Sequence, residues 1–279
     1  MTTEPSQTWA SREAVEVWRR GLDRRRQALA AATERLLERA NLRPGSRVLD
    51  LAAGTGEQSL LALQRVGPSG SVLATDVSGS MLEVAEQSAR EAGAGNLQTR
   101  IMDLASVDPS LGPFDAAICR LGLMFASDLG ATLRGVLQVL APGARFAAVV
   151  WASAERNPVL GLPDSIADRL GWPLGPRQTL HRALSLGDPA RLEAAFGSAG
   201  FVDVVIEPVA APRSFNSAAD AVHFSRTESP VWRELVAEVP PQDAEEFWQE
   251  VERAFRRYEG SSGCVIPGEV LVASGTRPS

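Results

Sequence analysis

Two glycines and one acidic residue in the first third of the chain have the spacing of a nucleoside site. Gly54 and Gly56 follow the apolar run 47–51, and glycines there let the backbone turn sharply and approach a ligand. Asp76 ends a second apolar run, at the distance where the second strand of a doubly wound unit presents an acid to ribose hydroxyls. Taken alone, the glycine pair also fits an ordinary tight turn between a strand and a helix. The acid at position 76 favours the ligand site.

The residues after the glycines discriminate between two nucleoside cofactors. A dinucleotide fingerprint has a third glycine where this chain has Ser59, and it leaves the start of the helix free for a pyrophosphate. Glu57 occupies that start, and its carboxylate repels phosphates but tolerates a sulfonium and an amino group. The loop therefore favours S-adenosylmethionine over NAD.

Alternating strands and helices must bring these residues to one edge of a sheet. Apolar runs predict strands at 47–51, 71–76, 97–102, 114–119 and 144–151, and helical spacing predicts helices at 57–66, from Ser80 to near Gly93, and at 128–140. Ser80 and Glu83 form an S-x-x-E capping box. A helix at 188–199 and strands at 201–206 and 269–274 follow. This alternation predicts a parallel α/β sheet.

Three further segments do not fit the repeating unit, and each is long enough to cover the ligand edge. Residues 9–40 predict one or two amphipathic helices with Gly21 as a candidate boundary, and residues 152–187 are rich in Pro and Gly. Residues 208–263 carry helical patterns and many of the aromatics. We expect these segments to form the pocket of the second substrate, with Trp18, Met124, Trp151 and Phe224 as its walls. The basic run 24–26 is interpreted as a solvated helix face.

The motifs together resemble the class I S-adenosylmethionine-dependent methyltransferases, and among them the ubiquinone and menaquinone C-methyltransferases. The resemblance rests on V-L-D-L-A-A-G-T-G-E at 48–57, T-D-V-S-G-S-M-L at 75–82, F-D-A-A-I-C-R-L-G-L-M-F at 114–125 and V-L-A-P-G-A-R-F at 139–146. It covers about residues 40–207 and the last strand. The long segment before that strand departs from the quinone enzymes, which puts a quinone acceptor in doubt.

This resemblance implies a Rossmann-like, doubly wound, seven-stranded sheet whose last strand is antiparallel and lies between the fifth and sixth. It implies that Asp76 holds the ribose and that Gly54 and Gly56 line the methionine moiety. The full set of residues that it assigns to the cofactor is Asp50, Ala52, Gly54, Gly56, Asp76, Val77, Met81, Met102, Asp103, Leu104, Arg120 and Leu121. The domains expected are an N-terminal helical lid (1–40), a core (41–207, with the 152–187 insertion), a helical cap (208–263) and the last strand and tail (264–279).

Composition limits the partners. The formal net charge is −6 with both signs mixed along the chain, which argues against nucleic acid and anionic membrane surfaces. No apolar run is long enough for a membrane span, and two cysteines are too few for a disulfide framework. We expect a cytoplasmic enzyme, monomer or homodimer, that binds no metal and methylates a small, mostly apolar metabolite at carbon or oxygen.

The alternatives are a nicotinamide-dependent oxidoreductase and a non-catalytic protein that keeps the cofactor fold. Methyl transfer from a sulfonium is an in-line displacement for which positioning can suffice, so no base is required. If one is used, the chain offers only His181 and His223, and His223 is the weak candidate.

Overall fold

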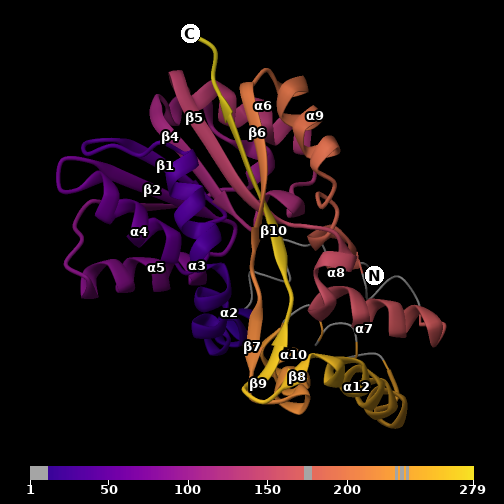
Figure 1. Cartoon of the computed structure of the whole chain (residues 1–279). Helices are drawn as coiled ribbons and strands as arrows, with labels where there is room; N and C mark the ends of the chain where they lie inside the picture. Colours follow the sequence, from indigo (N-terminus) through magenta and orange to yellow (C-terminus); the bar gives the residue numbers. More distant parts are fainter. Residues whose placement is uncertain (1–11, 173–177, 230–231, 233–235, 237–238) are drawn as a thin grey trace.

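The computed structural model describes residues 12–172, 178–229, 232, 236 and 239–279. A long twisted sheet with helices on both faces occupies one end of the molecule, and a smaller cap of helices and short strands occupies the other (Figure 1). The C-terminus lies at the end far from the cap (Figure 1).

Seven strands make the main sheet, in the order β3-β2-β1-β4-β5-β10-β6. Their bounds are β1 Arg47–Leu51, β2 Ser71–Asp76, β3 Leu97–Ile101, β4 Phe114–Arg120, β5 Leu140–Trp151, β6 Val202–Ala210 and β10 Glu269–Thr276. Strands β1 to β5 pair in parallel, whereas β10 is antiparallel to both β5 and β6. The doubly wound fold with its last strand inserted between the fifth and sixth is confirmed.

The order reverses at β1, because the chain runs outward to β3 and then resumes at β4 on the other side. Right-handed crossovers then place the helices before and after the reversal on opposite faces. Accordingly α4 (Glu57–Val66) and α5 (Gly79–Glu91) pack on one face, and α6 (Leu129–Val139) and α9 (Pro189–Ala199) on the other (Figure 1). The crevice between β1 and β4 is the switch point where ligands of such sheets bind.

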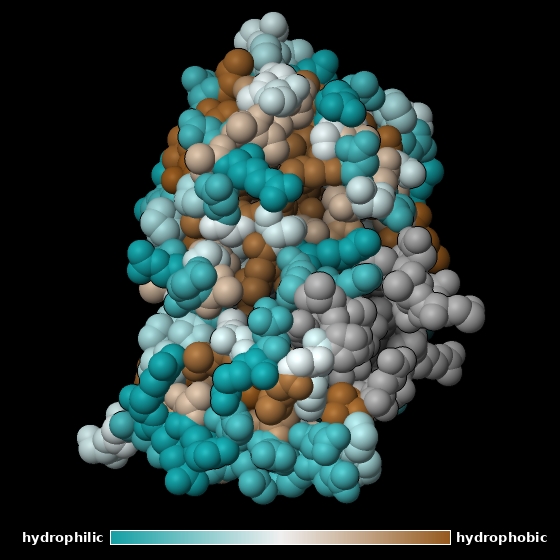
Figure 2. Space-filling model, turned by 90° about the vertical axis from the view of Figure 1, so that its right-hand side faces the viewer, coloured by the Kyte–Doolittle hydropathy of each residue, from teal (hydrophilic) through white to brown (hydrophobic). Residues whose placement is uncertain are grey.

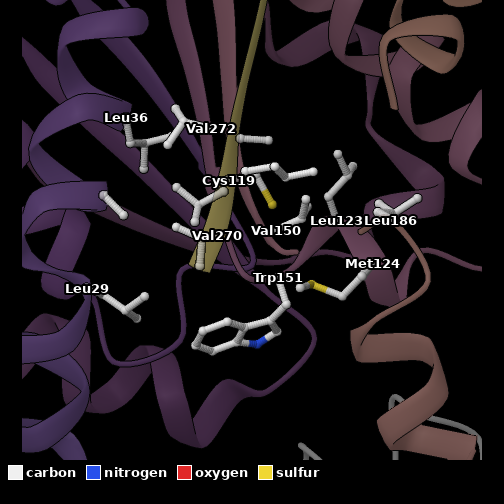
Figure 3. Close-up of a cluster of buried hydrophobic side chains, with 14 of the residues drawn as sticks. Leu29, Leu36, Cys119, Leu123, Met124, Val150, Trp151, Leu186, Val270 and Val272 are labelled. Atoms are coloured by element: carbon white, nitrogen blue, oxygen red, sulfur yellow. The ribbon is translucent and has the colours of Figure 1, made fainter. Parts of the chain in front are cut away.

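The N-terminal segment folds as α2 (Arg12–Arg20) and α3 (Leu22–Arg39), and the break falls at Gly21 as expected. Leu29 and Leu36 of α3 pack into the apolar core against the sheet, together with Val270 and Val272 of β10 (Figure 3). The core strands are apolar on both faces because helices cover both, which explains their nearly unbroken hydrophobic runs.

The described part of the cap contains three short strands and four helices. The helices α7 (Pro158–Arg169) and α8 (Gln178–Ala183) come from the 152–187 insertion, while α10 (Ala218–Glu228) and α12 (Pro241–Phe255) come from the 208–263 segment. The strands form a second sheet, in the order β7-β9-β8, that the sequence did not predict; their bounds are β7 Arg213–Phe215, β8 Glu259–Gly260 and β9 Gly263–Ile266. Strand β9 pairs with β7, so this sheet continues beyond the boundary expected at residue 263.

Two local predictions were wrong. The cap of α5 is Ser78 and not Ser80, because the Ser78 side chain accepts a hydrogen bond from the Met81 amide at 3.3 Å. Strand β5 begins at Leu140 and not at 144, since Leu140 already pairs with Phe114 and the Pro142-Gly143 turn forms an irregularity within the ladder. A local side-chain hydrogen bond decided the first outcome, and pairing across the sheet decided the second.

Candidate functional site

A cavity of about 250 Å³ lies where the carboxyl ends of the parallel strands meet the cap. It contains most of the residues that the resemblance assigned to the cofactor: Ala52, Gly54, Asp76, Val77, Met81, Met102, Asp103, Leu104, Arg120 and Leu121. All three additional segments also reach it, through Arg25 of α3, Leu160 and Arg182 of the first insertion, and Arg213 and Phe224 of the cap. One cavity therefore joins the core and its insertions.

Asp76 and Gly54 are coupled directly at the floor of this cavity. The Gly54 amide donates to one carboxylate oxygen of Asp76 at 2.9 Å, and the Ser78 amide donates to the other at 2.9 Å. Burial raises the pKa of Asp76, while these two donors act against the rise. A carboxylate offers about four lone-pair positions, so each oxygen keeps one for a ligand hydroxyl.

The two glycines differ in what they do. Both have a left-handed backbone, φ +56° at Gly54 and +79° at Gly56. A Cβ on Gly54 would meet no atom within 4 Å, whereas a Cβ on Gly56 would lie 2.6 Å from the Ala85 Cβ. Gly54 is therefore open to a ligand. Gly56 does not line the cavity, and it permits α5 to pack against the start of α4.

Asp50 also lies outside the cavity lining, because it is fully buried beneath the loop. Its carboxylate accepts hydrogen bonds from the Ser59 hydroxyl at 2.5 Å and from the Gln58 side-chain amide at 3.2 Å. Burial raises the pKa of Asp50 to about 7. Asp50 thus positions the loop and α4, and Ser59, at the third-glycine position of a dinucleotide loop, is its partner.

Two non-glycine residues of the lining have a left-handed backbone. Ala52 at the end of β1 has φ 51°, and Leu121 at the end of β4 has φ 59°. Such conformations are costly for residues with a Cβ and cluster at functional sites. They occur on the two strands that flank the switch point.

Glu57 is not the isolated negative charge that the sequence suggested. Its carboxylate accepts from Arg120 at 2.9 Å and from Arg26 at 3.1 Å. The Arg120 and Glu57 side chains are only 7% and 9% exposed. Two arginines therefore neutralise the charge of Glu57, so this charge alone does not exclude a pyrophosphate.

Asp103 lines the cavity and also has a local structural role. Its carboxylate accepts from the Ala105 amide at 2.8 Å and caps the short helix η1 (Leu104–Ser106). Asp103 is exposed, so its second oxygen remains accessible to a ligand.

The expected walls of the second pocket divide into two kinds. Trp151 and Phe224 line the cavity. Met124 does not, because it is buried in the apolar cluster beside Trp151 (Figure 3). The side chain of Trp18, on α2, is outside the described residues.

Neither histidine lines the cavity. His223 is exposed on α10, and the exposed His181 contacts Asp164 at 3.2 Å. His223 thus has no position from which to act as a base on a molecule in the cavity. Within the described part of the chain, no cluster of His, Cys, Asp or Glu could hold a metal ion. In the same residues, no helix is long and apolar enough to cross a membrane.

The basic run 24–26 is solvated at Arg26, whose side chain is 63% exposed, but the interpretation as a solvated face was wrong for the buried Arg25. Arg24 pairs with Asp220 of α10, Arg26 pairs with Glu57, and Arg25 is 7% exposed and lines the cavity. No sequence pattern pointed to Arg213, which also lines the cavity and is one of 28 basic residues in the chain. Three consecutive arginines on a helix were the only available signal for Arg25.

Residues 48–143, which carry β1 to β4 and the cofactor-side lining, match a family model described as a methyltransferase domain. This segment is similar to methyltransferase domains. The ubiquinone/menaquinone biosynthesis C-methyltransferase of Ectopseudomonas mendocina is 36% identical over 125 residues, which is 44% of this chain and 48% of that protein. The chain thus spans about half the length of the curated relatives it matches.

Solved structures support the fold of the chain around this segment. The YcgJ protein of Bacillus subtilis superposes with a TM-score of 0.61 at 20% identity, over 90% of this chain and 99% of that one. Phosphoethanolamine N-methyltransferase 2 of Haemonchus contortus, solved with S-adenosylhomocysteine, gives 0.59 at 14% identity over 98% of this chain and 59% of that one. The similarity of fold therefore extends beyond residues 48–143 to most of the chain.

Proposed function

We propose that the protein transfers a methyl group from S-adenosylmethionine to a small, mostly apolar metabolite at carbon or oxygen. The observation that carries the proposal is the Asp76–Gly54 pair at the floor of the cavity, inside the segment that matches the methyltransferase domain. Asp76 would accept hydrogen bonds from the ribose hydroxyls through its remaining lone pairs. Gly54, with no atom near its absent Cβ, would let the methionine moiety lie against the backbone.

Other lining residues suit the adenine. Met81, Met102 and Leu104 supply apolar, adaptable side chains around the part of the cavity next to Asp76, and the free oxygen of Asp103 can accept from an exocyclic amine. The acceptor would occupy the remainder of the cavity, below the cap. When bound, the cofactor supplies an activated methyl carbon, and the chain supplies the alignment of the two reactants.

Alignment can account for much of the rate. Holding two reactants in line contributes roughly 7 to 11 kcal/mol to lowering a barrier. Because no histidine lines the cavity, we attribute the rate of methyl transfer to positioning of the reactants and not to a general base.

Calorimetric titration with S-adenosylhomocysteine tests the proposal. We expect binding by the wild type, a loss of affinity of at least about tenfold in Asp76→Ala, and unchanged affinity in His223→Ala, since Asp76 would lose charge-assisted hydrogen bonds. A screen of phenols, quinones and polyketide-like compounds with a labelled methyl donor would then identify the acceptor. Absence of binding by the wild type would contradict the proposal.

A further inference from the structure

The cap end of the cavity is unusually cationic for a pocket that accepts an apolar molecule. Arg25, Arg182 and Arg213 line it, and Glu228 is the acid that the cap contributes to the lining. Burial, and then the charge of Arg213, lower the pKa of Arg25 to about 9, which shows that the two guanidinium groups influence one another. Two cations that share a partly dry cavity repel, and an anion between them would relieve that cost.

Arg213 is the residue best placed to bind such an anion. Its guanidinium carbon lies 5.0 Å from the ring centroid of Trp151 and 5.8 Å from that of Phe224. The residue as a whole is half-buried. Burial of its guanidinium lowers the pKa of Arg213 to about 10, and no neighbouring carboxylate contributes to this shift. It still carries its charge at neutral pH, and among the described residues it forms no ion pair.

The packing leaves the hydrogen-bond donors of Arg213 available. Cation–π contacts use the faces of the aromatic rings, whereas the N–H groups of a guanidinium project in its own plane. That planar fork matches the two oxygens of a carboxylate. Trp151 and Phe224 thus orient a charged fork and also offer apolar surface to the body of the same ligand.

Arg213 packs at the β5 side of the cavity, whereas Asp76 lies at its β2 side. Trp151 ends β5 and Asp76 ends β2, and β1 and β4 lie between these strands. Three strand spacings of about 4.8 Å separate the two ends by roughly 14 Å. Trp151 closes the apolar core at the end of β5 (Figure 3), so Arg213 above it faces the acceptor region.

We propose that the methyl acceptor is an acid, with a carboxylate bound by the guanidinium of Arg213 and an apolar body packed on Trp151 and Phe224. This inference rests on the proposed function and narrows its substrate class. On the lower end of the molecule, where the cap lies, hydrophilic residues predominate and hydrophobic residues are exposed between them (Figure 2).

The test compares two probes that differ only in the acid. Protein saturated with S-adenosylhomocysteine is titrated calorimetrically with 4-hydroxybenzoate and with 4-hydroxybenzamide. We expect the wild type to bind the acid at least about tenfold more tightly, because a charge-assisted fork to a carboxylate is lost with the amide. Arg213→Gln should reduce the ratio to about twofold or less, while Arg191→Gln, an exposed arginine on α9, should keep it.

Two controls keep the outcomes separate. Arg213→Lys retains the charge without the fork and should give an intermediate ratio even if Arg213→Gln fails to fold. S-adenosylhomocysteine affinity should be unchanged in both variants, whereas a loss of it would mean that Arg213 binds the cofactor and would overturn the inference. Equal binding of the two probes by the wild type, or an unchanged ratio in the variants, would also overturn it. If the wild type does not bind S-adenosylhomocysteine, the proposed function itself fails.

Discussion

At the scale of single residues, the candidate site depends on a carboxylate that no ligand is expected to touch. Asp50 is fully buried, and its hydrogen bonds to Ser59 and Gln58 tie the end of β1 to α4. Gln58 also donates to the Ala53 carbonyl at 3.2 Å, which extends the same network into the loop. These buried hydrogen bonds fix the loop that carries Gly54 to the end of β1 and to α4.

The pKa of Asp50 predicts a pH-dependent stability. Burial raises it from 3.8 to about 7, so the native state retains a proton that the unfolded state releases. The protonated Asp50 stabilises the native state fully below about pH 4, and this stabilisation is lost as the pH rises through about 7. The free energy of unfolding should fall by about 4 kcal/mol at most. Asp50→Asn removes the charge and keeps one acceptor oxygen for the Gln58 amide, while its NH2 group can donate to the Ser59 hydroxyl oxygen. Denaturant unfolding between pH 4.5 and 8 should show its advantage over wild type growing with pH.

Asp103→Asn is the matched control for this experiment. Asp103 is exposed, and asparagine is an equally good helix cap, so its unfolding free energy should follow that of the wild type at each pH. A constant offset between Asp50→Asn and wild type across the pH range would contradict the prediction.

At the scale of elements, the start of α4 must approach α5 closely. Gly56 combines φ +79° with a Cβ position 2.6 Å from Ala85, whereas Gly143 combines φ +76° with open space. Gly143→Ala should therefore cost only the left-handed strain, about 1–2 kcal/mol. Gly56→Ala should cost about 1–3 kcal/mol more, because α5 must move. Chemical denaturation of the two variants measures the difference, and equal losses would refute the role given to Gly56.

The elements of the core were predictable because their signals are local. Buried parallel strands have continuous apolar runs, and glycine and Asp-x-x patterns mark the turns and caps between them. Asp128 and Asp188, for example, cap α6 and α9 where the sequence placed the helix starts. The small sheet of the cap was missed because its three strands are short and β7 pairs with β9 across about fifty residues.

At the scale of the whole molecule, Arg24 connects the N-terminal helices to the cap. Its guanidinium donates to both carboxylate oxygens of Asp220 at 3.0 Å and to the Ser214 carbonyl at 3.1 Å, and it lies 5.2 Å from the ring centroid of Phe215. These contacts join α3 to β7 and α10. The N-terminal helices and the cap, which both contribute to the lining of the cavity, are thereby joined to each other.

Arg24→Gln should loosen the cap. Because the pair is only partly buried, we expect a loss of about 1–2 kcal/mol in unfolding free energy, with faster amide exchange in residues 213–228. Arg256→Gln removes an exposed pair with Glu252 within one helical stretch and should cost only a few tenths of a kcal/mol. Hydrogen exchange read by mass spectrometry compares the two, and unchanged exchange in the cap of Arg24→Gln would refute the connection.

The sequence by itself determined the core strands, the glycine loop, the position of Asp76 and the relation to methyltransferases. Each of these depends on residues that are close in the chain and whose spacing follows from strand and helix geometry.

Only the tertiary structure decided which side chains share the cavity. Arg25 and Arg213 lie 188 positions apart by residue number, and nothing local distinguishes Arg213 from the other arginines. The same holds for Met124, which packing turns into the core, and for His223, which its helix face turns to solvent. The direction of a side chain depends on what the rest of the chain packs against it, and that information is not carried by local spacing.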